Sequence, residues 1–183
     1  AIANDVHGKN HHRKGTFGHH VLALELLRSD GRHIELMPGE PTGLFEATVA
    51  GLGLTGVITR ACLQLRRVPG PWMEVESIRF DNLDEFFFLS SRSAALCEYT
   101  VAWIDCLARG KSLGRGHFLR ADHVDGDGRP EPRPSRLTMP FVPPLSLVNR
   151  LTLRPLNWLY FHRQRHKHQR TLSHYRPYFY PLD

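Results

Sequence analysis

The chain has 183 residues, of which 41% are hydrophobic and 23% charged. These values are close to the averages of soluble globular domains, which excludes a fibrous repeat, a disulfide-dense mini-protein and wholesale disorder. The longest apolar runs, such as 21–27 and 83–89, are far shorter than the ~20 residues of a membrane-spanning helix. We therefore expect a cytoplasmic protein, or one peripheral to the inner face of the membrane, with no transmembrane segment in this chain.

Positive charge is concentrated near the C-terminus. The formal net charge is +6, yet residues 1–131 carry 15 basic and 17 acidic residues. Residues 132–182 hold nine basic residues and no acidic one: Arg133, Arg136, Arg150, Arg154, Arg163, Arg165, Lys167, Arg170 and Arg176. This pattern predicts contact with an anionic partner, such as a phosphate-bearing substrate or an acidic lipid surface.

Apolar pieces and prolines interrupt this basic segment, so it is not built like a recognition helix for nucleic acid. Basic and apolar residues together favour an anionic membrane surface instead. Two alternatives to an anionic partner are a basic face that contacts only solvent, and a surface whose basic residues pair with acidic residues of the same protein.

The first third of the chain contains signals for a small sheet. Asp30-Gly31 predicts a tight turn between strands at 21–28 and 33–37. A helix is expected at 44–50, ending at Gly51, and an alternating strand at 57–67.

Pro69-Gly70-Pro71 marks the expected domain boundary. After it we expect an antiparallel sheet with helices on one face, which makes the fold class α+β. The expected elements are a strand at 73–80, a helix from a cap at Asp81 or Asn82 to Leu96, strands at 99–107 and 117–123, a loop at 125–134, one or two short helices beyond Pro144, and a β-prone segment at 174–182.

Neither cysteines nor histidines predict a metal site. Three cysteines without paired spacing, Cys62, Cys97 and Cys106, favour free, buried thiols in a reducing compartment. The N-terminal histidines lack the helical spacing and carboxylate partner of a zinc site: His7, His11, His12 and His19. A metal-dependent hydrolase built on them remains an alternative that stoichiometric zinc would reveal.

The densest functional signal is the run Ala1-Ile2-Ala3-Asn4-Asp5-Val6-His7-Gly8-Lys9-Asn10-His11-His12, followed by Gly15-Thr16-Phe17-Gly18. Small residues and glycines allow a backbone to approach a flat ligand closely, and His7, Lys9 and Asn10 offer hydrogen-bond donors at its edge.

These runs resemble FAD-linked oxidoreductases of the vanillyl-alcohol oxidase superfamily. The resemblance continues through residues 25–31, 44–49, 51–58 and 102–105 and reaches Tyr180-Pro181-Leu182-Asp183. It implies that residues 1–69 form the end of an FAD-binding domain and residues 71–183 the incomplete start of a substrate domain. The chain, which opens on Ala1, would then be an internal fragment. The loop that holds the FAD pyrophosphate would precede it, and further catalytic residues would follow it. We expect noncovalent FAD in the full-length protein, and a fragment that alone lacks FAD and activity.

The same resemblance assigns roles to individual residues. Asn4, Asp5, Val6 and His7 would line the flavin, and Ile58 would contact the adenine side of the cofactor. Gly8, Lys9, Trp103 and Phe179 would face the substrate, with His7 and Lys9 catalytic. Asn4 replaces a cysteine and Phe179 a tyrosine of the best-known members, which bears on sugar specificity. Within the resemblance, a flavin-edge hydrogen bond without proton transfer is an alternative role for His7. From the residue type, a core position is an alternative for Trp103.

The implied reaction is hydride transfer to flavin N5 from a secondary alcohol of a sugar or polyprenyl-phosphosugar, in cell-wall biosynthesis, with a partner reductase. The alternative from composition is a non-enzymatic basic module that binds anionic lipid or nucleic acid through residues 132–182.

Overall fold

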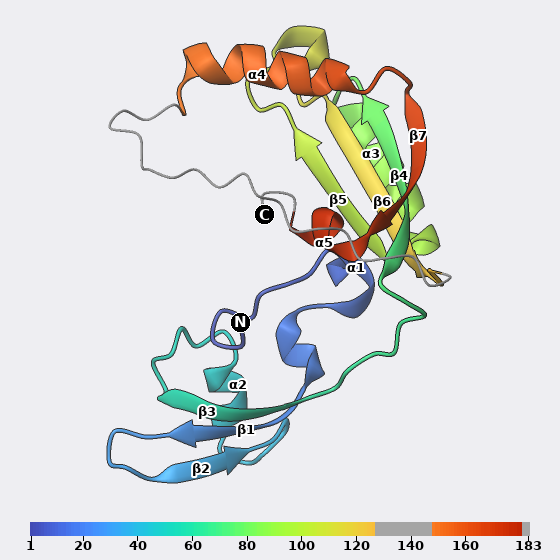
Figure 1. Cartoon of the computed structure of the whole chain (residues 1–183). Coiled ribbons are helices and arrows are strands. Elements are labelled where there is room, and N and C mark those ends of the chain that lie inside the picture. The colour runs from blue at the N-terminus through green and yellow to red at the C-terminus, as the bar shows by residue number, and fades with distance from the viewer. Residues whose placement is uncertain (127–147, 181–183) are drawn as a thin grey trace, which may run out of the picture. The chain divides into compact units, whose positions relative to one another are not determined.

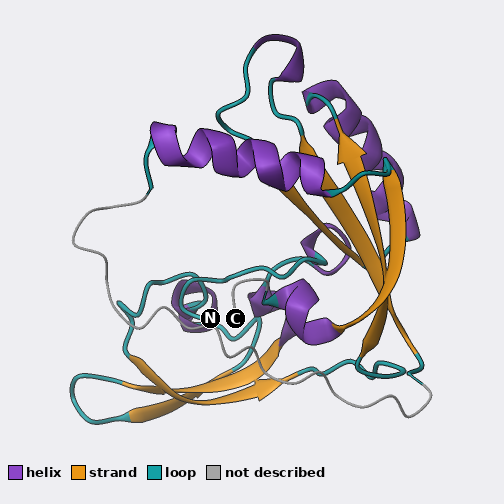
Figure 2. Ribbon diagram, turned by 45° about the horizontal axis from the view of Figure 1, so that its top comes forward, coloured by secondary structure: helices purple, strands orange, loops and turns teal. Residues whose placement is uncertain are grey.

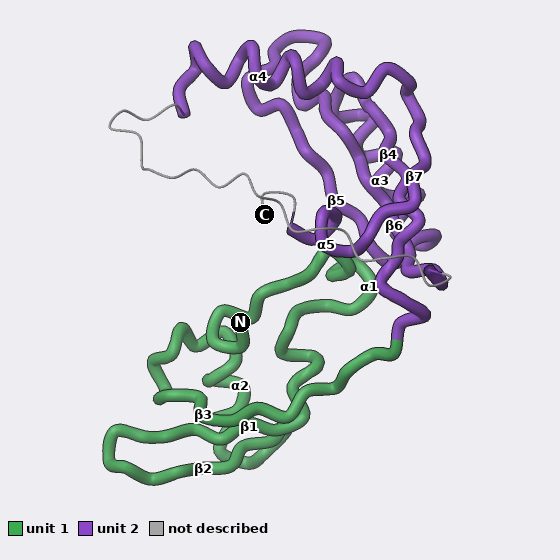
Figure 3. Tube along the Cα trace, viewed as in Figure 1, with its two compact units in different colours: residues 1–67 green, residues 68–183 purple. Residues whose placement is uncertain are grey.

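The computed structural model describes residues 1–126 and 148–180 (Figure 1). The chain divides into two compact units, residues 1–67 and 68–183 (Figure 3). The division falls just before Pro69-Gly70-Pro71. The assignment of these units to FAD-binding and substrate domains stays a prediction.

Unit 1 contains a three-stranded antiparallel sheet with the strand order β2-β1-β3. Gly31, with φ 81°, supplies the left-handed turn residue that the β1–β2 hairpin needs. The predicted hairpin, helix and third strand are confirmed. The helix ends two residues earlier than predicted, and the third strand ends at Leu63 rather than at residue 67. The elements are α1 (His11–Lys14), the 3₁₀ turn η1 (Phe17–His20), β1 (Val21–Leu27), β2 (His33–Leu36), α2 (Leu44–Thr48) and β3 (Val57–Leu63).

The core of unit 1 lies between the sheet and α2. Its buried members are Val21, Leu24, Leu26, Leu36 and Phe45. β3 is an edge strand whose residues are almost all exposed.

Unit 2 is built on a four-stranded antiparallel sheet with the order β5-β6-β4-β7. Asn82 caps α3, because its side chain accepts a hydrogen bond of 2.9 Å from the Glu85 N–H, as the sequence predicted. The elements are β4 (Trp72–Phe80), α3 (Leu83–Leu96), β5 (Tyr99–Ile104), the 3₁₀ turn η2 (Gly110–Ser112), β6 (Gly116–Val124), α4 (Arg150–Arg163), β7 (His168–His174) and α5 (Tyr175–Phe179).

Helices cover both faces of this sheet, so the prediction of helices on one face is wrong (Figure 2). Ile78, Phe80 and Phe118 pack against α3 through Phe86 and Leu89. Since side chains alternate along a strand, Met73 and Val75 point to the opposite face, where α5 packs. The predicted one-sided arrangement fails because both faces of the sheet carry buried apolar side chains, Ile78 and Phe80 on one and Met73 and Val75 on the other.

The predicted strand at 174–182 is also wrong. The strand lies earlier, at 168–174, and residues 175–179 form α5, whose Tyr178 is buried in the core. His174 caps α5, since its Nδ1 accepts from the Arg176 N–H at 3.3 Å. Aromatic residues favour strands locally, but burial of Tyr178 against the sheet decides the conformation here. The predicted loop at 125–134 lies mostly outside the described residues, as do Arg133 and Arg136.

The three cysteines are free, but Cys62 and Cys106 are exposed rather than buried, which corrects that expectation. Within residues 1–126 and 148–180, no helix has the length and apolar character needed to cross a membrane.

Candidate functional site

Backbone hydrogen bonds hold the N-terminal loop of unit 1 in place. The Val6 carbonyl accepts from the Phe17 N–H at 2.8 Å, and the Ala3 carbonyl accepts from the Leu52 N–H at 2.8 Å. Asp5 adopts the left-handed region at φ 42°, which reverses the chain inside the loop. The loop is therefore anchored both to η1 and to the turn that follows α2.

The Asp5 carboxylate is part of this anchor. Its Oδ1 accepts from the Gly18 N–H at 2.7 Å. A hydrogen bond from the Thr16 hydroxyl, followed by that of Gly18, holds the pKa of Asp5 below its ordinary value. Asp5 was predicted to line the flavin, and its carboxylate already has these partners within unit 1.

Gly18 lies close to Val49, the residue that follows α2, and to Asp5 of the loop. A Cβ there would lie 2.5 Å from Val49 Cγ1 and 3.0 Å from Asp5 Oδ1. Because real side chains do not approach that closely, glycine is needed at this position. It belongs to the Gly-Thr-Phe-Gly run that the sequence singled out.

The anchored loop exposes most of the side chains predicted to meet cofactor and substrate. Asn4, Val6, His7 and Gly8 are exposed, and the Lys9 side chain is half-buried. Desolvation lowers the pKa of Lys9 from its ordinary value. The loop thus presents an amide, an imidazole and an apolar surface around an ammonium group.

This set of groups suits the edge and face of a flat, polar ring system, because the ring's nitrogens and carbonyls need donors and its faces need apolar contact. Ile58, by contrast, is partly buried and packs on the core of unit 1 beside Leu26. Among the described residues, no group of three or more His, Cys, Asp or Glu side chains is placed to hold a metal ion.

In unit 2, Trp103 and Phe179 lie over the same face of the sheet but near different ends. The Trp103 ring contacts those of Tyr160 on α4 and His117 on β6, with centroid separations of 4.6 and 5.8 Å. The Phe179 ring is 5.2 Å from that of Tyr99. Trp103 is therefore held by aromatic packing, and both its substrate role and the core alternative stay predictions.

A cavity of about 390 Å³ opens on this face beside α4. Val75 and Leu119 give it apolar lining. Its polar lining includes Ser77, His117, Tyr160, Gln164, Gln169 and Thr171. A cavity of this volume is large enough for part of one small-molecule ligand.

His117 is the residue that sequence reasoning missed. It is 5% exposed, and its Nε2 lies 3.2 Å from the Tyr160 carbonyl, to which it donates. The Nδ1 atom is then an acceptor, and it is buried without a hydrogen-bond partner among the described residues. Burial lowers the pKa of His117 and favours its neutral form. A lone histidine in a strand carries no sequence signal for this contact with a helix more than 40 positions later.

The structure thus gathers residues 4–9 on one loop of unit 1, and Trp103 and Phe179 on one sheet face of unit 2. A single site shared by these two groups stays a prediction.

Comparisons with known proteins add the following. No protein-family model matches the chain. The chain is 34% identical, over an alignment of 194 positions that covers all of it, to decaprenylphosphoryl-beta-D-ribose oxidase of Mycolicibacterium smegmatis. It is 41% identical over 165 residues, 83% of its length, to an uncharacterized protein in the mprA 5′ region of Streptomyces coelicolor. It spans only 42% and 43% of the lengths of these two relatives. The predicted resemblance is therefore confirmed: along its whole length, this chain is a relative of decaprenylphosphoryl-beta-D-ribose oxidase.

Proposed function

We propose that the protein containing this chain is an FAD-dependent oxidoreductase that oxidises a secondary alcohol of a sugar or of a lipid-linked phosphosugar. The observation that carries the proposal is the alignment of the whole chain, at 34% identity, with decaprenylphosphoryl-beta-D-ribose oxidase. The anchored loop at 4–9 supports it, since this loop exposes side chains suited to a flavin.

Asn4, Val6 and His7 would hold the ring of the cofactor. Bound FAD supplies a two-electron acceptor that takes hydride at N5, which no amino-acid side chain provides. The protein's own part is to orient the alcohol and manage its proton.

Two side chains of the loop are suited to that part. The imidazole of His7 accepts the hydroxyl proton as the carbon loses hydride, because histidine exchanges protons near neutral pH. The Lys9 ammonium stabilises the negative charge that develops on the substrate oxygen. Its half-buried position strengthens this interaction, since charges interact more strongly away from water.

The cavity beside α4 is the proposed place for hydroxyl groups of the substrate that do not react. His117 Nδ1 would accept a hydrogen bond from one of them, and the exposed Gln169 and Thr171 would offer further partners. Trp103 would position α4 and the ring of His117 for this contact.

Absorbance of the purified full-length protein tests the proposal. We expect a flavin spectrum, release of free FAD on denaturation, and bleaching of the flavin when a lipid-linked phosphosugar is added without an electron acceptor. A protein that stays colourless after incubation with FAD would contradict the proposal and favour a non-enzymatic module. A flavin that no sugar alcohol bleaches would contradict the substrate class alone.

A further inference from the structure

The structure sorts the basic residues of the C-terminal segment into two groups. On β7 and just before it, the charges have acidic partners in the same unit. Lys167 Nζ lies 3.0 Å from Glu85 Oε1, and Arg170 Nε lies 3.6 Å from Glu76 Oε1. These residues are one half of an intramolecular ion-pair surface, so they contribute little net charge to a partner.

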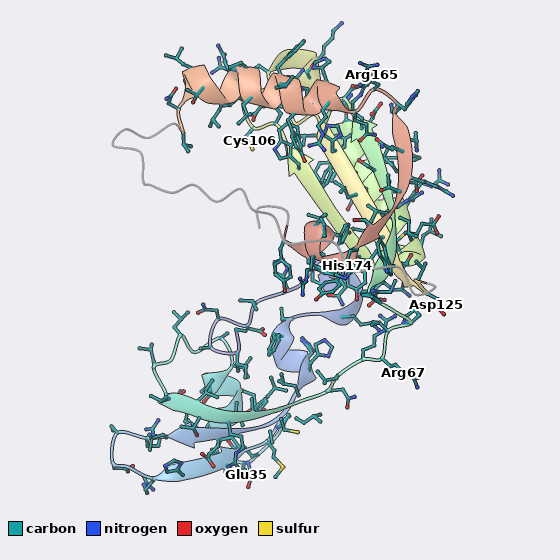
Figure 4. The ribbon with its side chains drawn as sticks, viewed as in Figure 1. Glu35, Arg67, Cys106, Asp125, Arg165 and His174 are labelled. Atoms are coloured by element: carbon teal, nitrogen blue, oxygen red, sulfur yellow. The ribbon has the colours of Figure 1, made fainter. Side chains whose placement is uncertain are left out.

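The arginines of α4 and its C-terminal extension behave differently. Arg150, Arg154, Arg163 and Arg165 are all exposed, and none forms an ion pair with a described residue. Figure 4 shows Arg165 just beyond the C-terminal end of α4. Residues 148–180 contain no acidic residue that would neutralise them.

Only a narrow stripe of α4 packs on the sheet. Phe161 is buried, with the Arg115 and Arg79 guanidiniums 4.6 and 5.3 Å from its ring centroid. Asn157, one turn earlier, donates to Asp105 Oδ1 at 2.8 Å. These contacts fix which side of the helix faces outward.

The outward side carries large apolar residues. Leu151 is 87% exposed, Leu159 62% and Trp158 56%, and Leu156 is also exposed. Leu151, Pro155 and Trp158 follow the i, i+4, i+7 spacing of one helix stripe. Pro155 cannot donate a hydrogen bond to the Leu151 carbonyl, and at this exposed position water or a polar headgroup replaces that donor.

We propose that the outward face of α4, made of Leu151, Leu156, Trp158 and Leu159 with Arg163, together with Arg165 just beyond it, docks on an anionic membrane surface. The apolar side chains enter the boundary between headgroups and acyl chains, and the arginines contact lipid phosphates. Tryptophan favours this boundary because its ring is apolar and its N–H is polar.

The geometry favours a helix that lies on a bilayer. Its 14 residues are about 21 Å long, which is too short to cross the hydrocarbon core. Exposed arginines beside this apolar face match an anionic surface, which a membrane provides. This inference does not rest on the flavin reaction, since it uses no residue of the N-terminal loop.

Sedimentation of the full-length protein with vesicles tests the proposal. One set contains equal parts of phosphatidylglycerol and phosphatidylcholine, and the other phosphatidylcholine alone. We expect binding to the first set that weakens as salt rises. Arg163→Gln with Arg165→Gln should lower the partition coefficient about thirtyfold, because each basic residue near an anionic surface contributes about 1 kcal/mol. Trp158→Ser with Leu159→Ser should remove the binding that persists at high salt.

Matched variants on unit 1 serve as controls. Arg32→Gln with Arg67→Gln removes the same charge, and Leu54→Ser with Leu65→Ser removes exposed leucines outside α4. We expect these to bind like the unmodified protein. Equal losses in the test and control variants, or no binding to anionic vesicles, would overturn the proposal. Binding to inorganic phosphate alone, seen as release from vesicles by millimolar phosphate at constant ionic strength, would overturn it in favour of a phosphate site.

Discussion

The two units treat their predicted functional residues in opposite ways. In unit 1, Asn4, Val6 and His7 project from a loop whose shape is set by backbone hydrogen bonds and by Gly18. In unit 2, Trp103 sits among the rings of His117 and Tyr160, so a residue predicted to bind substrate also joins α4 to the sheet. The contrast indicates that function and stability are separable in unit 1 and coupled in unit 2.

The largest effect is expected for Lys9→Gln in the full-length enzyme. Loss of the ammonium that stabilises developing charge should lower kcat/KM about 10²–10³-fold. The free energy of unfolding should change by less than about 0.5 kcal/mol, as for other loop side chains outside a core. Stopped-flow flavin reduction and denaturant unfolding measure the two quantities.

The pH profile sharpens this test. Since burial lowers the pKa of Lys9, activity that needs its ammonium should fall on the alkaline side at a pH below 10.5. Lys9→Arg should shift that fall to higher pH, because arginine keeps its proton. An unchanged rate of flavin reduction in Lys9→Gln would show that the functional residues of unit 1 have been misassigned.

Trp103→Ala should have the next largest effect, on stability. Removing a partly buried ring that packs against Tyr160 and His117 should lower the free energy of unfolding of unit 2 by about 2–3 kcal/mol. His7→Ala in unit 1 is the matched control and should cost less than about 0.5 kcal/mol. Similar losses for both variants in urea unfolding would remove the contrast between the units.

Much of this fold follows from local signals. The Asp30-Gly31 turn and the Asn82 cap predict their elements because neighbouring residues decide those conformations. β7, with the sequence His-Gln-Arg-Thr-Leu-Ser-His, lacks apolar alternation. It is held by pairing with β4 and by the ion pair of Arg170 with Glu76. These partners are almost 100 positions apart, so local sequence patterns cannot predict the contacts.

The candidate site shows the same limit. The loop at 4–9 is contiguous, so its residues could be named from the sequence. The contact of His117 with Tyr160 joins positions 43 residues apart, and it depends on where α4 docks. The nine basic residues could be counted in advance, but only the fold separates those paired with Glu76 and Glu85 from those on α4.

Gly18→Ala should have a smaller effect, confined to unit 1. The added Cβ meets Val49 Cγ1 at 2.5 Å, and overpacking of this kind costs about 1–3 kcal/mol. Combining it with Val49→Ala should recover part of the loss, giving a coupling energy of at least about 0.5 kcal/mol. Strict additivity in the double-mutant cycle would mean that the loop and α2 do not meet as described, and that the anchor of unit 1 lies elsewhere.

The smallest effect is expected for the pH dependence of unit 2. Burial holds the pKa of His117 below its ordinary value of 6.5, so the unfolded chain takes up a proton on this residue before the folded chain does. The contribution of neutral His117 to stability is therefore complete above pH 6.5 and is lost as the pH falls below it.

His117→Gln keeps an N–H donor for the Tyr160 carbonyl but does not titrate. The difference in unfolding free energy between the two proteins should be constant above pH 6.5 and should shift in favour of the variant below it. Other histidines on this face, such as His123 and His174, are present in both proteins and therefore cancel in that difference. Parallel profiles across this range would show that His117 is not held neutral by the packing of α4, and that the coupling of site and stability in unit 2 does not extend to this residue.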